Sequence, residues 1–282
     1  MLKRTDIRLR DPFVLPHERT RTYYLYGTTD ANVWSGPATG FDVYRSADLE
    51  HWEGPFPAFR PGPGFWADRN YWAPEVHVYG GRYYMFASFK AEGRCRGTQI
   101  LAADAPEGPF APLTEGPVTP PGWECLDGTL HIDETGTPWM VFCREWLQVS
   151  DGEMHAMRLS PDLTAAAGEP VLLFRASEAP WTRPSRDGHY VTDGPFLFRG
   201  RDGKLVMLWS SIGPKGYAMG VARSLSGRVT GPWEHDANAA FDEDGGHGML
   251  FRTFEGLPTV AIHKPNKSAL ERPHFLAWGD GV

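Results

Sequence analysis

The sequence predicts an all-β fold, a five-bladed β-propeller whose four-stranded blades surround a central channel. Three observations support this prediction. The 282 residues include 32 Gly and 25 Pro, and 13% are aromatic, which is typical of many short strands joined by turns. One strand pattern recurs five times along the chain. Helical periodicity is absent apart from a short turn at residues 162–167, which excludes a helical bundle.

The recurring pattern is a Gly-rich or charged turn followed by an aromatic or apolar strand. Its copies start at intervals of roughly 50 to 70 residues, a spacing that suits propeller blades. The copies lie at residues 21–27, 80–87, 135–142, 202–209 and 254–261.

A second pattern follows the first and supplies the outer part of each unit. It reads as a strand followed by a segment that closes with Gly-Pro, at residues 41–55, 99–110 and 218–233, with a looser copy at 154–163. Each unit therefore holds about four short strands, which bury their faces only by stacking against further copies. A two-sheet sandwich would not need the same strand order five times. No linker is visible, so we expect one domain over residues 1–282.

Composition limits the partners. The formal net charge is -7 and no Lys/Arg cluster is present, so we do not expect nucleic acid as a partner. No apolar run is long enough to cross a bilayer. Residues 1–6 are partly basic but no apolar segment follows, so we expect no secretory signal and a cytoplasmic protein. The three cysteines form no CxxC motif and are expected to be free thiols: Cys95, Cys125 and Cys143.

Three aspartates lie where a turn leads into an apolar strand. Asp11 belongs to the first unit, Asp127 to the third and Asp193 to the fourth. The innermost strand of each propeller blade lines the channel, so we expect the three side chains to face one another across a funnel. A single Asp before Gly or Pro is more often a turn former. Three at matching places favour a shared site.

Carboxylates that face one another across a pocket suit the cleavage of glycosidic bonds. One carboxylic acid protonates the leaving oxygen and one carboxylate activates water, with inversion when roughly 6.5 to 9.5 Å separate them. A third carboxylate raises the pKa of the acid by repulsion between like charges.

Four motifs carry a resemblance to a known family. They are RDPF at residues 10–13, WAPEV at 72–76, LDGTL with IDETG over 126–136, and DGPFL at 193–197. In this order they resemble glycoside hydrolase family 43, the five-bladed propeller enzymes that include arabinofuranosidases, xylosidases and arabinanases. The resemblance implies that Asp11 is the general base, Asp127 tunes the pKa of the acid and orients it, and Asp193 holds the position of the general acid.

The sequence departs from the family pattern at the acid. The family usually carries Glu-Gly-Pro where this chain has Asp193 before Gly-Pro. Aspartate is one methylene shorter, and a displacement of about 1 Å can cost on the order of a hundredfold in rate. We regard Glu145, and after it Glu75, as reserve candidates for the acid.

Further residues are candidates for binding the substrate. Trp72 and Trp146 suit stacking on a sugar ring, although core packing explains either one. Glu75 and Glu145 are expected to hydrogen-bond sugar hydroxyls or neighbouring arginines. Arg252 is expected to line the same mouth.

His247 follows two glycines and begins the inner strand of the fifth unit. A lone histidine is usually structural. The resemblance implies a channel cation, commonly calcium, near such a histidine, although calcium prefers oxygen ligands. No cofactor is expected to be required.

Together these features predict an inverting, exo-acting glycosidase for α-L-arabinofuranosyl or β-D-xylosyl oligosaccharides. Two alternatives remain open at this point. A propeller glycoside phosphorylase would need a basic cluster at the mouth, where the candidates are scattered: Arg10, Arg144, Arg252 and Lys264. A non-catalytic sugar-binding propeller would explain the aspartate at position 193.

Overall fold

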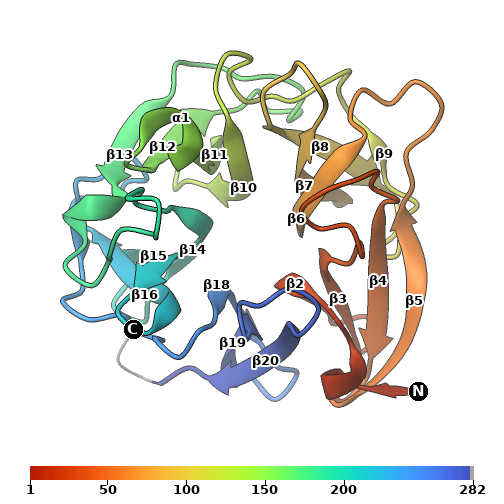
Figure 1. Ribbon diagram of the computed structural model, residues 1–282. Helices are drawn as coiled ribbons and strands as arrows, with labels where there is room; N and C mark the ends of the chain where they lie inside the picture. Colours follow the sequence, from red (N-terminus) through yellow and green to blue (C-terminus); the bar gives the residue numbers. More distant parts are fainter. Residues whose placement is uncertain (280–282) are drawn as a thin grey trace.

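The computed structural model describes residues 1–279, which form five antiparallel sheets arranged as blades around a central axis (Figure 1). The predicted five-bladed β-propeller is confirmed. The last three residues of the expected domain, 280–282, lie outside the described residues. The five copies of the recurring pattern fall on the second strand of each blade, and an inner strand precedes each copy.

The strands follow one another from the axis outward. Blade I holds β2 (Arg10–His17), β3 (Thr22–Thr28), β4 (Phe41–Ser46) and β5 (His51–Phe59), with β1 (Leu2–Lys3) paired to β5. Blade II holds β6 (Arg69–Tyr79), β7 (Arg82–Lys90), β8 (Gly97–Ala103) and β9 (Ala111–Pro112). Blade III holds β10 (Cys125–Ile132), β11 (Pro138–Arg144), β12 (Glu153–Arg158) and β13 (Val171–Arg175).

Blade IV holds β14 (Asp193–Arg199), β15 (Leu205–Gly213), β16 (Gly216–Ser224) and β17 (Trp233–His235). Blade V holds β18 (Gly246–Arg252), β19 (Pro258–Lys264) and β20 (Arg272–Ala277), so the described part of this blade has three strands. Helix α1 (Trp146–Val149) is a single turn between β11 and β12. Residues 1–279 contain no helix with the length and apolar character needed to cross a membrane.

Apolar side chains fill the spaces between neighbouring blades. One cluster joins blades III and IV around Phe174 and Trp209, and another joins blades IV and V through Leu208 and Ile262. Each sheet alternates side chains between its two faces, so each blade presents apolar surface to both neighbours. This packing holds the inner strands at fixed positions around the axis.

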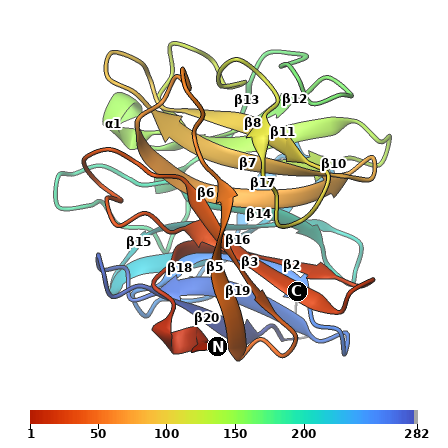
Figure 2. The ribbon, with the colours of Figure 1, turned by 90° about the vertical axis from the view of Figure 1, so that its right-hand side faces the viewer.

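A buried ion pair joins the two ends of the ring. Arg10, which begins β2, lies with Nη1 3.0 Å from Oε1 of Glu271, just before β20. The backbone N–H of Leu9 also donates to the carbonyl of Glu271 at 3.3 Å. Figures 1 and 2 both show β2 beside blade V. Because both charges are buried, the loss of one partner would leave the other unpaired, which costs about 3–5 kcal/mol.

Every inner strand breaks its pairing near its start. The register shifts lie between Arg10 and Phe13, Trp72 and Glu75, Leu126 and Thr129, Asp193 and Phe196, and Gly246 and Met249. The second residue of each break has a positive φ: Asp11 (53°), Ala73 (47°), Asp127 (55°), Gly194 (51°) and His247 (52°). Such bulges re-aim side chains next to functional sites.

A ring of hydrogen bonds between blades holds these five bulge residues. In four blades the bulge N–H is accepted by a side chain on the second strand of the preceding blade. The pairs are Ala73 to Oγ1 of Thr28 (2.8 Å), Asp127 to Oγ of Ser88 (2.9 Å), His247 to Oγ of Ser210 (2.8 Å), and Asp11 to Nδ1 of His263 (3.2 Å). Gly194 differs, because its N–H is accepted by Oδ2 of Asp127 at 3.0 Å.

Candidate active site

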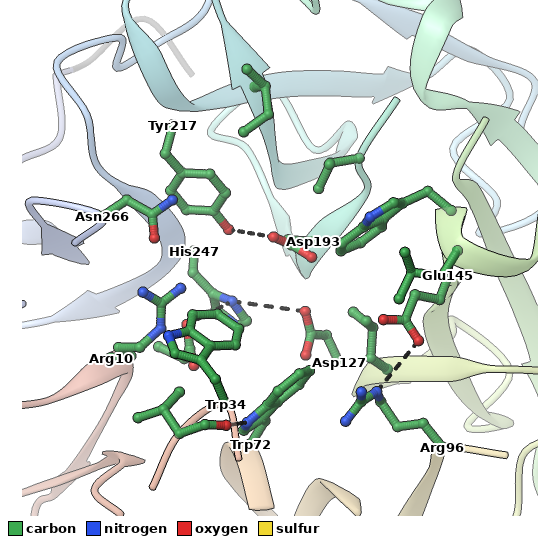
Figure 3. A pocket seen from close by; sticks show the side chains of 17 residues that line it. Arg10, Trp34, Trp72, Arg96, Asp127, Glu145, Asp193, Tyr217, His247 and Asn266 are labelled. Atoms are coloured by element: carbon green, nitrogen blue, oxygen red, sulfur yellow. Dashed lines mark hydrogen bonds and ion pairs between the residues drawn. The ribbon is translucent and has the colours of Figure 1, made fainter. Parts of the chain in front are cut away.

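A cavity of about 330 Å³ lies on the axis at the end where the inner strands begin. All five blades contribute to its lining, through Asp11, Trp72, Asp127, Asp193 and His247. Figure 3 shows Asp127, Asp193 and His247 pointing toward one another. The expectation that the three aspartates meet at one funnel is therefore met by the geometry.

The sequence pattern suggested that the three aspartates occupy equivalent positions. In the structure they occupy different positions within their bulges. Asp11 and Asp127 occupy the positive-φ position, whereas Asp193 precedes it and Gly194 takes its place. The reason is space. A Cβ on Gly194 would lie 2.7 Å from Cγ of His247, so this position accepts only glycine without movement of the ring. The carboxylate of blade IV therefore comes from the preceding residue.

Asp11 lies among donors and positive groups. Oγ1 of Thr28 donates to Oδ2 of Asp11 at 2.7 Å, and Nδ1 of His247 lies 3.2 Å from its Oδ1. Burial alone would raise the pKa of Asp11, but His247 and then Arg10 outweigh it and lower the pKa to about 2. Asp11 is therefore a carboxylate at neutral pH.

Asp193 has the opposite environment. Burial, and next the charge of Asp127, raise its pKa far above the ordinary carboxyl range, while Tyr217 donates from Oη to its Oδ2 at 3.0 Å. Burial, followed by the charge of Asp11, also raises the pKa of Asp127, although His247 and the N–H of Gly194 favour its ionised form. Because His247 and the N–H of Gly194 both lie beside Asp127 and stabilise its carboxylate, Asp193 is the carboxyl that keeps a proton.

His247 lies between two of the carboxylates. Its Nδ1 is 3.2 Å from Oδ1 of Asp11 and 3.8 Å from Oδ2 of Asp127. Burial opposes the imidazolium, but the carboxylates, Asp11 first, outweigh burial and raise the pKa of His247. When protonated, the ring places a positive charge at the centre of the carboxylate cluster.

The residues around His247 offer few ligands for a calcium ion. Calcium takes six to eight oxygen ligands, whereas His247 offers a ring nitrogen that already faces Asp11 as an ion-pair partner. Within residues 1–279 no group of three or more His, Cys, Asp or Glu side chains is arranged to hold a metal. The calcium ion near His247 stays a prediction, and no chemical step below uses one.

The predicted walls of the cavity include Trp72, Trp146 and Glu145, and all three line it. Nε of Arg96 lies 3.4 Å from Oε2 of Glu145, and its guanidinium lies 3.8 Å from the ring centroid of Trp72 (Figure 3). Glu145 is thus the counter-ion of a buried arginine. A contact with a neighbouring arginine was one of the two contacts expected for it. Within the described residues Asp193 has no such cationic partner, and its pKa is raised.

Two of the predicted residues lie outside the lining of the cavity. Glu75 is buried on β6, where its Oε2 lies 2.9 Å from Nε2 of His77. Arg252 ends β18, the strand that starts beside His247 at Gly246. With about 3.3 Å per residue, the strand carries Arg252 away from the mouth. The guanidinium of Arg252 is exposed and donates to the carbonyl of Gly256 at 3.2 Å.

Sequence reasoning missed several residues that line the cavity. Trp34 comes from the segment between β3 and β4, and Arg96 directly precedes β8. Tyr217 comes from β16, the third strand of its blade. The recognisable motifs lie on the inner strands, so loops and third strands gave no signal. Arg10, which the sequence placed at the mouth, also lines the cavity, as does Asn266 from the segment after β19.

Comparison with known proteins places these features in a family. The family "Glycosyl hydrolases family 43" matches residues 5–276. The chain is 43% identical to a solved structure described as an endo-arabinase from Bacteroides thetaiotaomicron VPI-5482, with a TM-score of 0.92 and coverage of 99% of this chain and 97% of that one.

Two curated relatives are more distant. The exo-α-(1→5)-L-arabinofuranosidase ArbA of Cellvibrio japonicus (strain Ueda107), named as extracellular, is 26% identical over 81% of this chain and 67% of its own length. The endo-α-(1→5)-L-arabinanase 1 of Bacillus subtilis (strain 168), also named as extracellular, is 23% identical over 48% of this chain and 49% of its own length. With the family match over residues 5–276, the five blades and the carboxylates at their hub, the chain belongs to the family 43 glycosyl hydrolases and is a glycosidase.

Proposed function

We propose that this chain is an inverting, exo-acting glycosidase that releases terminal α-L-arabinofuranosyl groups from short oligosaccharides. Asp11 is the general base, Asp193 the general acid, and Asp127 the residue that raises the pKa of the acid. One observation carries the proposal: a single cavity holds a carboxyl with a lowered pKa and another with a strongly raised pKa. This separation is what acid–base catalysis by two carboxyl groups requires.

In the proposed reaction, Asp193 gives its proton to the glycosidic oxygen while the bond to the anomeric carbon breaks. Asp11 takes a proton from a water molecule, whose oxygen attacks the anomeric carbon from the opposite face. His247 and Asp127 support this division, because His247 contacts Asp11 and Asp127 contacts the residue after Asp193. Each turnover leaves Asp11 protonated and Asp193 ionised, and solvent exchange restores both groups.

The proposed substrate rests on the similar proteins and on the size of the cavity. The similar proteins named above act on arabinan or arabinofuranosides by their descriptions. The cavity, at about 330 Å³, is at the lower end of the roughly 300–1,000 Å³ typical of ligand pockets. That size suits a terminal sugar better than a long internal segment of polysaccharide. β-D-Xylosyl groups are the second candidate.

The charges at the mouth favour water over phosphate as the attacking group. The two arginines that line the cavity already face carboxylates, and a phosphate would have to compete with each of them. The pairs are Arg10–Glu271 (3.0 Å) and Arg96–Glu145 (3.4 Å). Arg144 and Lys264 lie outside the lining and pair with Glu153 (3.5 Å) and Glu243 (2.8 Å).

A panel of aryl glycosides tests the proposal. We expect hydrolysis of p-nitrophenyl α-L-arabinofuranoside at the same rate with and without phosphate, and release of the inverted anomer in proton NMR. Linear α-(1→5)-arabino-oligosaccharides should yield arabinose as the first product. Asp11→Asn should abolish turnover, whereas Asp202→Asn, on an exposed turn, should leave it unchanged. Longer first products would contradict the exo mode, and full activity of Asp11→Asn would contradict the assigned base.

A further inference from the structure

The shorter acid has a tyrosine hydroxyl as its hydrogen-bond partner. Asp193 is one methylene shorter than the glutamate that the family pattern carries, and the hydroxyl of Tyr217 contacts its carboxyl at 3.0 Å. We propose that Tyr217 positions the general acid: its hydroxyl holds Oδ2 of Asp193, so that Oδ1 carries the proton that reaches the leaving oxygen. This inference rests on the proposed role of Asp193.

Tyr217 reaches the cavity from an unexpected strand. It lies on β16, two strands outward from β14. Its ring packs closely against Gly246, where an added Cβ would lie 2.8 Å from Cε1 of the tyrosine. The ring is 3% exposed and stacks on His263 with centroids 5.4 Å apart and an angle of 18°. Blades IV and V therefore fix the position of the hydroxyl.

The direction of the hydrogen bond follows from the charges. Burial, and then the carboxyl groups of Asp193, Asp11 and Asp127, raise the pKa of Tyr217 well above its ordinary value. Tyr217 thus keeps its proton and donates it to Oδ2 of Asp193. An oxygen that accepts this bond acts as the carbonyl of a neutral carboxyl group, so the acidic proton resides on Oδ1.

The ring of His263, on which Tyr217 stacks, connects the acid to the base. Nδ1 of His263 accepts the backbone N–H of Asp11 at 3.2 Å, and its Nε2 lies 3.3 Å from Oδ1 of Asn266. Burial, and next the charge of Arg10, lower the pKa of His263 to about 3, so the ring is neutral. Tyr217 stacks on one face of this neutral ring, and Nδ1 at the edge of the ring binds the backbone of Asp11. The ring therefore fixes the positions of the two carboxyl groups relative to each other.

Tyr217→Phe tests the proposal, because it keeps the ring and removes the hydroxyl. With the acid misplaced, we expect kcat on an alkyl α-L-arabinofuranoside to fall roughly tenfold to a hundredfold. On a dinitrophenyl arabinoside, whose leaving group needs no proton, kcat should change little. In an Asp193→Ala background the same substitution should cause no further loss. Equal losses on both substrates would overturn the proposed role.

Tyr24→Phe is a matched control. It removes a tyrosine-to-carboxylate hydrogen bond of similar length, 2.8 Å to Oε1 of Glu107, outside the lining of the cavity. We expect no change of kcat on either substrate. A loss like that of Tyr217→Phe would mean that removal of any buried tyrosine hydroxyl has this effect, and would overturn the specific role of Tyr217.

A measurement without turnover separates this inference from the proposed function. Carbon-13 NMR of the aspartate carboxyls, assigned with Asp193→Asn, reports the pKa of Asp193 directly. The hydroxyl donor favours the carboxylate, so Tyr217→Phe should raise this pKa further, while Asp127, His247 and Asp11 continue to face the group. An unchanged pKa would show that the hydroxyl of Tyr217 does not donate to Asp193, and would overturn the proposed role of Tyr217. A raised pKa in a protein that cleaves no glycoside overturns the proposed function and leaves the contact established.

Discussion

The carboxylate of Asp127 accepts the backbone N–H of Gly194, the residue that follows Asp193, at 3.0 Å. In the other blades this bond goes to a side chain on a second strand, and the equivalent position in blade III is Cys143. A thiol is a weak acceptor, so Asp127 takes its place. The residue that raises the pKa of Asp193 is thus tied to the backbone that carries Asp193.

Asp127→Asn should move the basic limb of the pH profile of kcat/KM to lower pH. The charge of Asp127 is, after burial, the main cause of the raised pKa of Asp193. Without it Asp193 loses its proton at a lower pH, and the active form disappears earlier as the pH rises. Rates on aryl arabinosides across pH 4–9 test this. A basic limb that stays in place would show that burial alone keeps Asp193 protonated.

Asp193→Ala should lower kcat most on substrates with poor leaving groups. General acids contribute roughly 10²–10⁴-fold when the departing oxygen needs a proton, so we expect a loss of that size on alkyl arabinosides. The loss on dinitrophenyl arabinosides should be much smaller. Parallel measurement of Glu145→Ala, which removes the counter-ion of Arg96, distinguishes the reserve acid. A steeper dependence on the leaving group for Glu145→Ala would transfer the role to Glu145.

The base and the acid should affect stability with opposite signs. The folded pKa of Asp11 is about 2, below the ordinary value, so its carboxylate stabilises the fold above about pH 4, and this stabilisation disappears as the pH falls through the folded value. Asp11→Asn should therefore cost about 2 kcal/mol at pH 7. Urea titrations should show little difference from the wild type at pH 2.

Asp193→Asn should stabilise the fold at neutral pH. Both states are protonated below about pH 4. Above it the unfolded chain releases the proton while the folded state retains it, so the wild type loses up to about 1.4 kcal/mol per pH unit. The variant avoids this loss. We expect equal urea midpoints near pH 4 and a higher midpoint for the variant at pH 7, and equal midpoints at pH 7 would contradict the raised pKa.

Gly194→Ala should disturb both stability and activity. Its φ of 51° already disfavours a side chain, and the added Cβ would meet the ring of His247 at 2.7 Å. Gly203→Ala is the matched control, because Gly203 has a φ of 77° and nothing within 4 Å of an added Cβ. The control should cost about 1–2 kcal/mol from φ alone. Gly194→Ala should cost more and also lower kcat, and equal costs would show that His247 moves aside freely.

Removal of metals should leave the activity intact. His247 already lies between Asp11 and Asp127, and its raised pKa favours the positively charged ring, so we expect EDTA dialysis and calcium addition to leave kcat and KM unchanged. His247→Gln, which removes the charge, should lower kcat. A loss of activity in EDTA that calcium restores would establish the calcium ion and contradict this expectation.

The sequence predicted the repeats because residues close together in the chain determine turns and strands. The turn-and-strand pattern at residues 80–87 and its four counterparts fell on second strands, since turn chemistry and strand propensity act over a few neighbours. Cys95, Cys125 and Cys143 are free thiols, as expected. Contacts such as Tyr217 with Asp193 or Arg96 with Trp72 join segments that no local pattern connects.

The sequence by itself determined the five units, the family motifs and the three aspartates, because these depend on residue types and on their order. Only the tertiary structure decided which carboxyl holds a proton, because that depends on burial and on charges brought together from different blades. It also decided that Gly194 and not Asp193 occupies the bulge, because the ring of His247, 53 positions later in the chain, fills the space that a side chain would need.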